Sequence, residues 1–226
     1  MVDLDEIEAL AEIEEYPTHT VASVMGRHPP GGSNLHYRLE AVQTPPALAA
    51  GKAESGWDFE TLLGQYDPNE GEVVIWKKGI DYVADLMKVP ERMIQRIVKY
   101  HEFAHGVHHL GLMGAASPHS AAASIMADVR FRAAPEEIRE QIAQLATVAS
   151  IRDRLAGAAH PAARKFLGAM LDTVFVMMNR QREQYRVPLA TKTMDLKRLK
   201  TKLGLILNMC DSGVFPTAFH IEGIID

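Results

Sequence analysis

The chain has a single cysteine and no long apolar run. Cys210 alone, among 226 residues, excludes an internal disulfide and a zinc cluster built from cysteines, and it fits a reducing compartment. The start of the chain is acidic, with neither a basic region nor a long apolar core, so no signal peptide is indicated. No run approaches membrane-spanning length. We therefore expect a cytoplasmic protein that does not contact a membrane.

An excess of positive charge is also lacking. Lysine and arginine number 24 against 29 aspartates and glutamates, which gives a net charge of -5 at pH 7. Such a chain has no general attraction for nucleic acid or anionic lipid, so neither is expected as a partner. Hydrophobic residues are abundant, at 47%. This content suffices for one domain with a sizeable core, or for one domain with a small appendage.

The segment 99–110, KYHEFAHGVHHL, contains His101, Glu102 and His105 in the order H-E-x-x-H. On a helix the two histidines lie one turn apart on one face, so both imidazoles can reach one ion while Glu102 projects beside it. Zinc suits this arrangement because it binds imidazole nitrogen, and a catalytic zinc keeps one position open for water. A carboxylate next to a ligand can deprotonate that water. The motif therefore predicts a zinc site.

The surroundings of the motif favour an inward-facing pair of histidines. Pro90 is expected at the first helical position, and no further glycine or proline occurs before Gly106. Both histidines fall on one stripe with aliphatic residues, and charged residues lie opposite. Two other interpretations are buried histidines bonded to the backbone and a surface helix that happens to be rich in histidine. Buried imidazoles beside a carboxylate need a partner, which favours the metal site.

A third ligand has to come from another segment. His108 lies about 10 Å from His101 along a straight helix, too far for both to bind one ion, so we do not expect it to be a ligand. The helix predicted from Pro135 carries Glu140 on a side lined by small residues, where a buried carboxylate needs compensation that zinc supplies. Glu136 and Glu137 suit a solvated first turn but remain alternatives as the third ligand.

Hydrophobic patterns indicate the fold class. Residues 35–42 alternate loosely and predict a strand, and 61–66 and 72–76 flank a turn containing proline and glycine, which predicts an antiparallel hairpin. Helices are predicted over 3–15 and 80–88 and from Pro90, Pro135 and Pro161. We expect an α+β fold, mostly helical, with the hairpin at about 61–77 packed on the motif helix. Its parts are an N-terminal helical segment (1–34), a core (35–156) and a C-terminal helical segment packed on the core (157–226).

The segment 62–151 resembles a known family. The run H-E-F-A-H-G-V-H-H, preceded by a hairpin and followed by E-x-x-A-Q at 140–144, resembles the gluzincin zinc metallopeptidases. Among them it is most similar to the ImmA/IrrE-like peptidases, whose pattern is H-E-L-G-H-x-x-x-H followed by E-x-x-A-N. The resemblance implies a zincin-like core with Zn²⁺ bound by His101, His105 and Glu140. It also implies that Glu102 is the base and that His109 matches the outer histidine.

The first functional hypothesis is a zinc-dependent endopeptidase that hydrolyses a protein or peptide substrate. Glu102 would activate the zinc-bound water and pass its proton to the leaving amine. His109 lies within about 20° of Glu102 around the helix and two turns further on. It is therefore either a residue that contacts the substrate or the developing oxyanion, or a surface histidine.

Two other hypotheses come from different classes of protein. In one, the site holds zinc but catalyses no reaction, and the protein has a regulatory or binding role. In the other, the chain is a helical interaction protein without a metal. The metal content of the protein separates the last hypothesis from the first two, and the effect of Glu102→Gln separates those two from each other.

Overall fold

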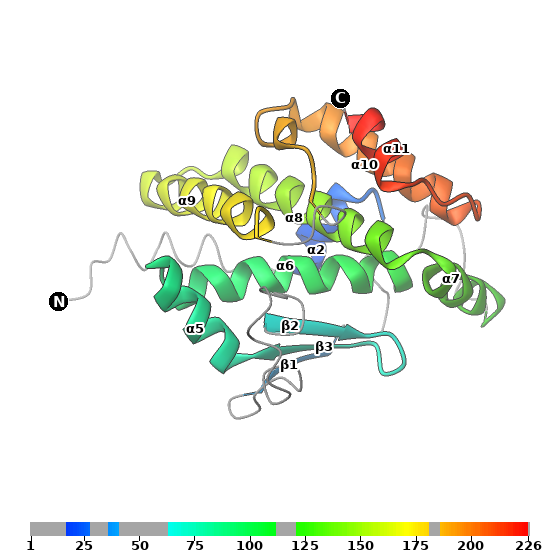
Figure 1. Ribbon diagram of the computed structural model, residues 1–226, viewed down its shortest axis with the longest axis horizontal. Helices are drawn as coiled ribbons and strands as arrows, with labels where there is room; N and C mark the ends of the chain where they lie inside the picture. Colours follow the sequence, from blue (N-terminus) through cyan, green and yellow to red (C-terminus); the bar gives the residue numbers. More distant parts are fainter. Residues whose placement is uncertain (1–16, 28–35, 41–62, 112–120, 181–185, 226) are drawn as a thin grey trace.

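The computed structural model describes residues 17–27, 36–40, 63–111, 121–180 and 186–225, with the backbone alone at 36–40, 121–124, 218–220 and 222. This part of the chain is mostly helical and contains one small sheet (Figure 1). The expected α+β class, mostly helical, is therefore confirmed. The helix predicted over 3–15 lies outside the described residues.

The sheet contains three strands in the order β1-β3-β2. The hairpin strands β2 (Gly64–Asp67) and β3 (Glu72–Trp76) are antiparallel, with Asp67 opposite Glu72. Strand β1 (His36–Glu40) pairs with β3 in parallel. In the turn, the Asn69 backbone N–H donates to the Asp67 carboxylate at 2.8 Å, and Gly71 has φ +63°, a conformation that suits glycine. The predicted strand and hairpin are both present.

Two helices follow the hairpin directly. Helix α5 (Lys77–Met87) begins immediately after β3, three residues before the predicted start, and Lys88 ends it in the left-handed region at φ 56°. Helix α6 (Glu91–Leu110) contains the H-E-x-x-H motif. Pro90 is the N-cap residue of this helix and has an extended backbone, so its predicted place as the first helical residue was wrong by one position. Residues 100–109 of α6 are all buried.

Helix α6 lies between the sheet and several of the other helices (Figure 1). The sheet covers one side, while α2 (Pro17–Val24), α8 (Glu136–Gly157) and α9 (Pro161–Met178) lie on the other. Helix α10 (Leu196–Asp211) packs on α8 and contacts α11 (Ala218–Ile225). Between α9 and α10 is the short 3-10 helix η3 (Leu189–Lys192). Among the described residues, no helix combines the length and apolar character that a membrane span requires.

Helix α8 is buried on almost all sides. Every residue from Ile138 to Ile151 is buried except Arg139, which is half-buried. Small side chains such as Ala143, Ala146 and Ala149 allow neighbouring helices to approach closely. The fully buried large side chains of the core come from β3, α6, α8, α9 and α10, and they include Ile75, Ile94, Ile138, Ile142, Leu145, Met170 and Leu199. The core therefore surrounds α8 and the motif helix.

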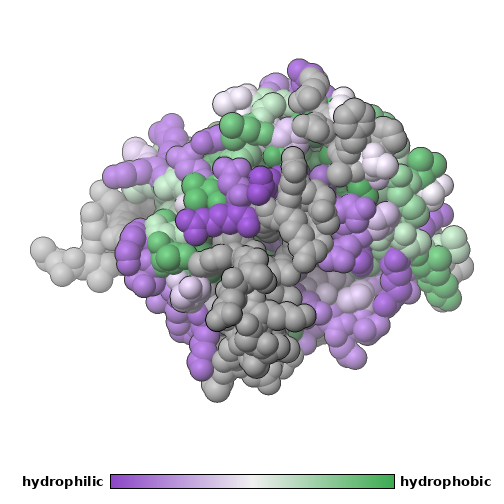
Figure 2. All heavy atoms as spheres, viewed as in Figure 1, coloured by the Kyte–Doolittle hydropathy of each residue, from purple (hydrophilic) through white to green (hydrophobic). Residues whose placement is uncertain are grey.

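Helix α7 (Ala121–Ala133) follows α6 in the described part of the chain and lies beyond the end of that helix (Figure 1). Its side chains Ile125, Met126 and Val129 are exposed. Figure 2 shows hydrophobic atoms at this end of the molecule, where α7 and the end of α10 lie. The opposite side of α7 carries Asp128 and Phe131, which face α6.

One buried arginine connects three helices. Arg27, just after α2, donates from Nη1 to the Gly111 carbonyl at 2.9 Å and to the His108 carbonyl at 3.5 Å. Its Nη2 forms an ion pair of 2.6 Å with Asp211 at the end of α10. The carbonyls in the last turn of a helix have no intrahelical partner, and a cation there is favoured by the helix dipole. Arg27 thus caps the motif helix and ties it to α10.

Candidate metal centre

The structure brings His101, His105 and Glu140 together. The two histidines come from successive turns of α6, and Glu140 comes from the second turn of α8, which packs against α6. The Nε2 atoms of the histidines lie 3.2 Å apart. Glu140 Oε2 lies 3.0 Å from His101 Nε2, and Glu140 Oε1 lies 3.1 Å from His105 Nε2. These residues form a buried group that can hold a metal ion.

The spacing of the three donor atoms fits a tetrahedral ion. Ligands bound at 2.0–2.1 Å to a tetrahedral centre lie about 3.3 Å from one another. The observed separations of 3.0–3.2 Å are slightly shorter, so only a small outward movement is needed. The two imidazole rings are nearly perpendicular, at 82°, and their Nε2 atoms lie close enough together to bind one ion. Two imidazoles and one carboxylate are also a ligand set that catalytic zinc uses.

The charge of Glu140 suits a metal ligand. Its burial would by itself raise the pKa of the carboxyl group. His105 and His101 outweigh that effect and hold the pKa of Glu140 far below its ordinary value. Glu140 is therefore an ionised carboxylate in a buried place, 9% exposed. A buried carboxylate needs a compensating positive charge, which either the two histidine rings or a divalent cation bound to their neutral forms can supply.

Glu102 lies beside the group of three and is 5% exposed. The pKa of Glu102 is raised to about 7, mainly by burial and to a smaller extent by the charge of Glu140. His101 and a hydrogen bond from the Tyr66 backbone N–H lower this pKa in part. Strand β2 reaches Glu102 because Gly64 has no side chain. A Cβ at position 64 would lie 2.7 Å from Val98 Cγ1 and 3.1 Å from Glu102 Cγ. The glycine therefore permits close packing of the hairpin on the motif helix.

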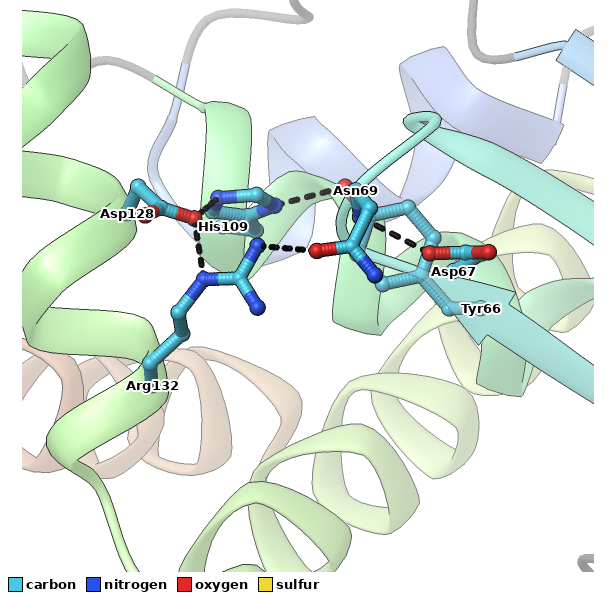
Figure 3. A network of polar contacts seen from close by, with 6 residues as sticks. All are labelled: Tyr66, Asp67, Asn69, His109, Asp128 and Arg132. Carbon is cyan, nitrogen blue, oxygen red and sulfur yellow. Dashed lines mark hydrogen bonds and ion pairs between the residues drawn. The ribbon is translucent and has the colours of Figure 1, made fainter.

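His109 is buried, at 3% exposure, and is not the surface histidine that one interpretation of the sequence expected. Its Nδ1 lies 2.7 Å from Tyr66 Oη, and its Nε2 lies 2.9 Å from Asp128 Oδ1 (Figure 3). The ring stacks on Phe131 with centroids 4.8 Å apart. Both ring nitrogens are therefore occupied by protein groups, and His109 offers neither of them to a substrate.

The other candidates from the sequence lie outside the group of three. His108 is buried against Phe131, with ring centroids 5.3 Å apart, and its Nδ1 has no hydrogen-bond partner among the described residues. It does not join the donor atoms of His101 and His105, as expected from its rise along the helix. Glu136 is exposed and Glu137 is half-buried in the first turn of α8. Neither is part of the group, so the alternatives to Glu140 are not supported.

Sequence reasoning missed Gly64, Tyr66 and Asp128. A signal existed for the first two, because residues 64 and 66 fall on the same face of a strand by alternation. Nothing in the spacing placed that face on Glu102. Asp128 carried no signal, since its role depends on how α7 packs against the end of α6.

The chain was compared with protein-family models, with curated proteins and with solved structures. None of the three comparisons finds a match. The inference of function therefore depends on the residues and the geometry of this site.

Proposed function

We propose that the protein is a zinc-dependent metallopeptidase that hydrolyses peptide bonds of a protein or peptide substrate. The observation that carries the proposal is the convergence of His101, His105 and Glu140 from two helices, with the buried carboxylate of Glu102 beside them. Zinc is the metal proposed because two imidazoles and a carboxylate form a known catalytic zinc set. Imidazole also binds other transition metals, so the test includes an analysis of which metal the protein contains.

His101, His105 and Glu140 would hold the ion. A bound zinc ion would polarise the scissile carbonyl and lower the pKa of a water molecule toward about 7. Glu102 would accept a proton as the water oxygen adds to the carbonyl carbon. The C–N bond then breaks, and Glu102 returns the proton to the leaving amine nitrogen. The products are a carboxylic acid and an amine, so no further reactant is needed.

Strand β2 supports an extended peptide as the substrate. Among the described strands, β2 has a neighbour on one side only, which is β3. An edge strand can pair with an extended peptide through backbone hydrogen bonds. Gly64 and Tyr66 of this strand pack directly on α6 near Glu102. A peptide that follows this edge would therefore pass close to the proposed catalytic carboxylate.

The test uses untagged full-length protein and its Glu102→Gln variant. Zinc content is measured in both, and both are incubated with a library of unstructured peptides whose new termini are mapped by mass spectrometry. We expect about one zinc per chain in both proteins and cleavage by the wild type alone, because Gln cannot accept the proton. Equal cleavage by both proteins, or no cleavage by the zinc-loaded wild type, would overturn the proposal.

A second candidate is a zinc-stabilised binding or regulatory protein without catalysis. The observation in its favour is the burial of all three donors, at 7–9% exposure, because a buried site restricts the access of a peptide substrate to the ion. In that case zinc removal would lower the melting temperature of both proteins, and no peptide of the library would be cleaved. The same experiment thus separates the two candidates.

A further inference from the structure

Asp128, His109 and Tyr66 form a chain of hydrogen bonds from α7 through α6 to β2 (Figure 3). The direction of each bond follows from the chemistry of the groups. Arg132 Nε donates to Asp128 Oδ1 at 2.7 Å, which keeps this carboxylate ionised. Asp128 therefore accepts a hydrogen bond from His109 Nε2–H. The Nδ1 atom of the neutral imidazole is then left as the acceptor for the Tyr66 O–H.

The three side chains are also fixed by packing. His109 stacks on Phe131 at an interplanar angle of 24°. The Tyr66 ring meets His109 and Phe131 edge to face, with centroids 5.8 Å and 6.1 Å apart. Such aromatic contacts stabilise a defined ring orientation. At the outer end, Arg132 Nη2 donates to Asn69 Oδ1 at 2.9 Å and connects α7 to the hairpin turn.

The backbone of Tyr66 connects this chain of bonds to the metal centre. Its N–H donates to the Glu102 carboxylate. Two residues earlier, Gly64 lies so close to α6 that a Cβ would be 3.1 Å from Glu102 Cγ. Strand β2 therefore packs against Glu102, and the buried side chain of Tyr66 anchors this strand to α6 through its hydrogen bond with His109. Glu102 is not bonded to His109 directly, so any effect of His109 has to pass through Tyr66.

We infer that His109 and Asp128 are positioning residues that hold Tyr66, and through its backbone N–H orient the carboxylate of Glu102. This inference rests on the proposed function of Glu102 and assigns His109 a role other than substrate contact. Residues that orient a metal site from outside the ligand shell are typically worth 10–100-fold in activity or metal affinity. Here the effect falls on kcat, because the residue oriented is the base and not a ligand.

The test uses zinc-loaded, full-length variants. His109→Phe preserves the stack on Phe131 but removes both hydrogen bonds, and Tyr66→Phe removes the hydroxyl alone. Hydrogen exchange of the residue 66 amide is followed by NMR, and kcat and KM are measured on a peptide cleaved by the wild type. We expect faster exchange at residue 66 and a loss of kcat of about 10–100-fold in both variants. KM and zinc content should be unchanged. His109→Gln, which has one donor and one acceptor, should recover part of kcat.

The matched control is Asn69→Ala, which removes the exposed contact of Arg132 with the turn but leaves the Asp128 to Tyr66 bonds in place. It should show wild-type exchange and kcat. If His109→Phe does not fold, Asp128→Ala provides the same test, because the Asp128 side chain is 39% exposed. Wild-type exchange and kcat in the folded variant would overturn the inference. Faster exchange without cleavage by any protein, the wild type included, would support the positioning contact and overturn the peptidase proposal alone.

Discussion

His108 shows how burial of one side chain makes stability depend on pH. Burial lowers the pKa of this imidazole well below its ordinary value of 6.5, and the neighbouring Arg27, His105, Arg139 and His109 lower it further. The unfolded chain takes up a proton at this residue below about pH 6.5, but the folded protein does not. Folding stability contributed by the neutral ring is therefore present above that pH and is lost as the pH falls through it.

We predict that His108→Leu removes this dependence. Between about pH 7.5 and about pH 5.5, the free energy of unfolding of the wild type should fall by about 1.4 kcal/mol more than that of the variant. At the higher pH the variant should be at least as stable, since Nδ1 of His108 has no hydrogen-bond partner to lose in the part of the chain that the structure describes. Urea unfolding of both zinc-loaded proteins measures the difference. Parallel pH profiles would contradict the prediction.

At the residue scale, sequence reasoning was most informative where spacing determines geometry. The separation of His101 and His105 by four positions is enough to bring their rings together on any helix. Glu140 could be predicted as a ligand because small residues on its side of the helix indicated a buried face. The roles of Tyr66 and Asp128 could not be predicted from the sequence, because their contacts depend on the angles at which β2 and α7 pack against α6. Such angles arise from packing of the whole core.

Among the secondary structure elements, the hairpin depends on Gly64 for its position on α6. We predict that Gly64→Ala costs roughly 1–3 kcal/mol of folding stability, because its Cβ would lie 2.7 Å from Val98 Cγ1 and 3.1 Å from the Val74 carbonyl. The strand would have to move away from the helix, and cleavage should fall together with stability. Denaturant unfolding and a cleavage assay measure the two effects.

The control for this prediction is Gly157→Ala, at the end of α8. A Cβ there would meet no atom of the described residues within 4 Å, and Gly157 does not have a positive φ. The Gly157→Ala substitution should leave the free energy of unfolding unchanged or increase it by up to about 1 kcal/mol, since alanine loses less backbone entropy on folding. If Gly64→Ala were as stable as this control, close packing of β2 on α6 would not be required.

The elements themselves were largely predictable, but not all their pairings. Proline and glycine positions gave the hairpin, the start of α8 and the start of α9 within a residue or so. The strand at β1 was also indicated by alternation. Its parallel pairing with β3 was not, because alternation identifies a strand but not its partner. The prediction for Pro90 was wrong by one position because proline is compatible both with the first helical position and with the extended backbone of the N-cap.

At the scale of the whole molecule, one continuous hydrophobic core contains residues from α2 through α11, including Val21, Ile142 and Ile225. It therefore draws on all three parts predicted from the sequence. The ion pair of Arg27 and Asp211 adds a polar connection between two residues that are 184 positions apart in the chain. Its side chains are 4% and 16% exposed, so the pair is largely removed from water.

We predict that Arg27→Met destabilises the protein by roughly 3–5 kcal/mol, because the carboxylate of Asp211, only 16% exposed, is left without its partner. The double variant Arg27→Met, Asp211→Leu should recover part of this loss, since no isolated charge remains. Recovery should be incomplete because the carbonyls of His108 and Gly111 still lack a donor. Urea unfolding of the three proteins measures both effects. A double variant less stable than the single one would show that the charge of Asp211 is not the cause.

The same pair also sets an order of events during synthesis. Arg27 and Asp211 are 184 positions apart, and at 5–20 residues per second the aspartate is made about 10–40 s after the arginine. His101, His105 and Glu140 are all made within that interval. During synthesis, all three proposed ligands are therefore present before Asp211 can pair with Arg27 and fix the end of α6, the helix that carries two of them.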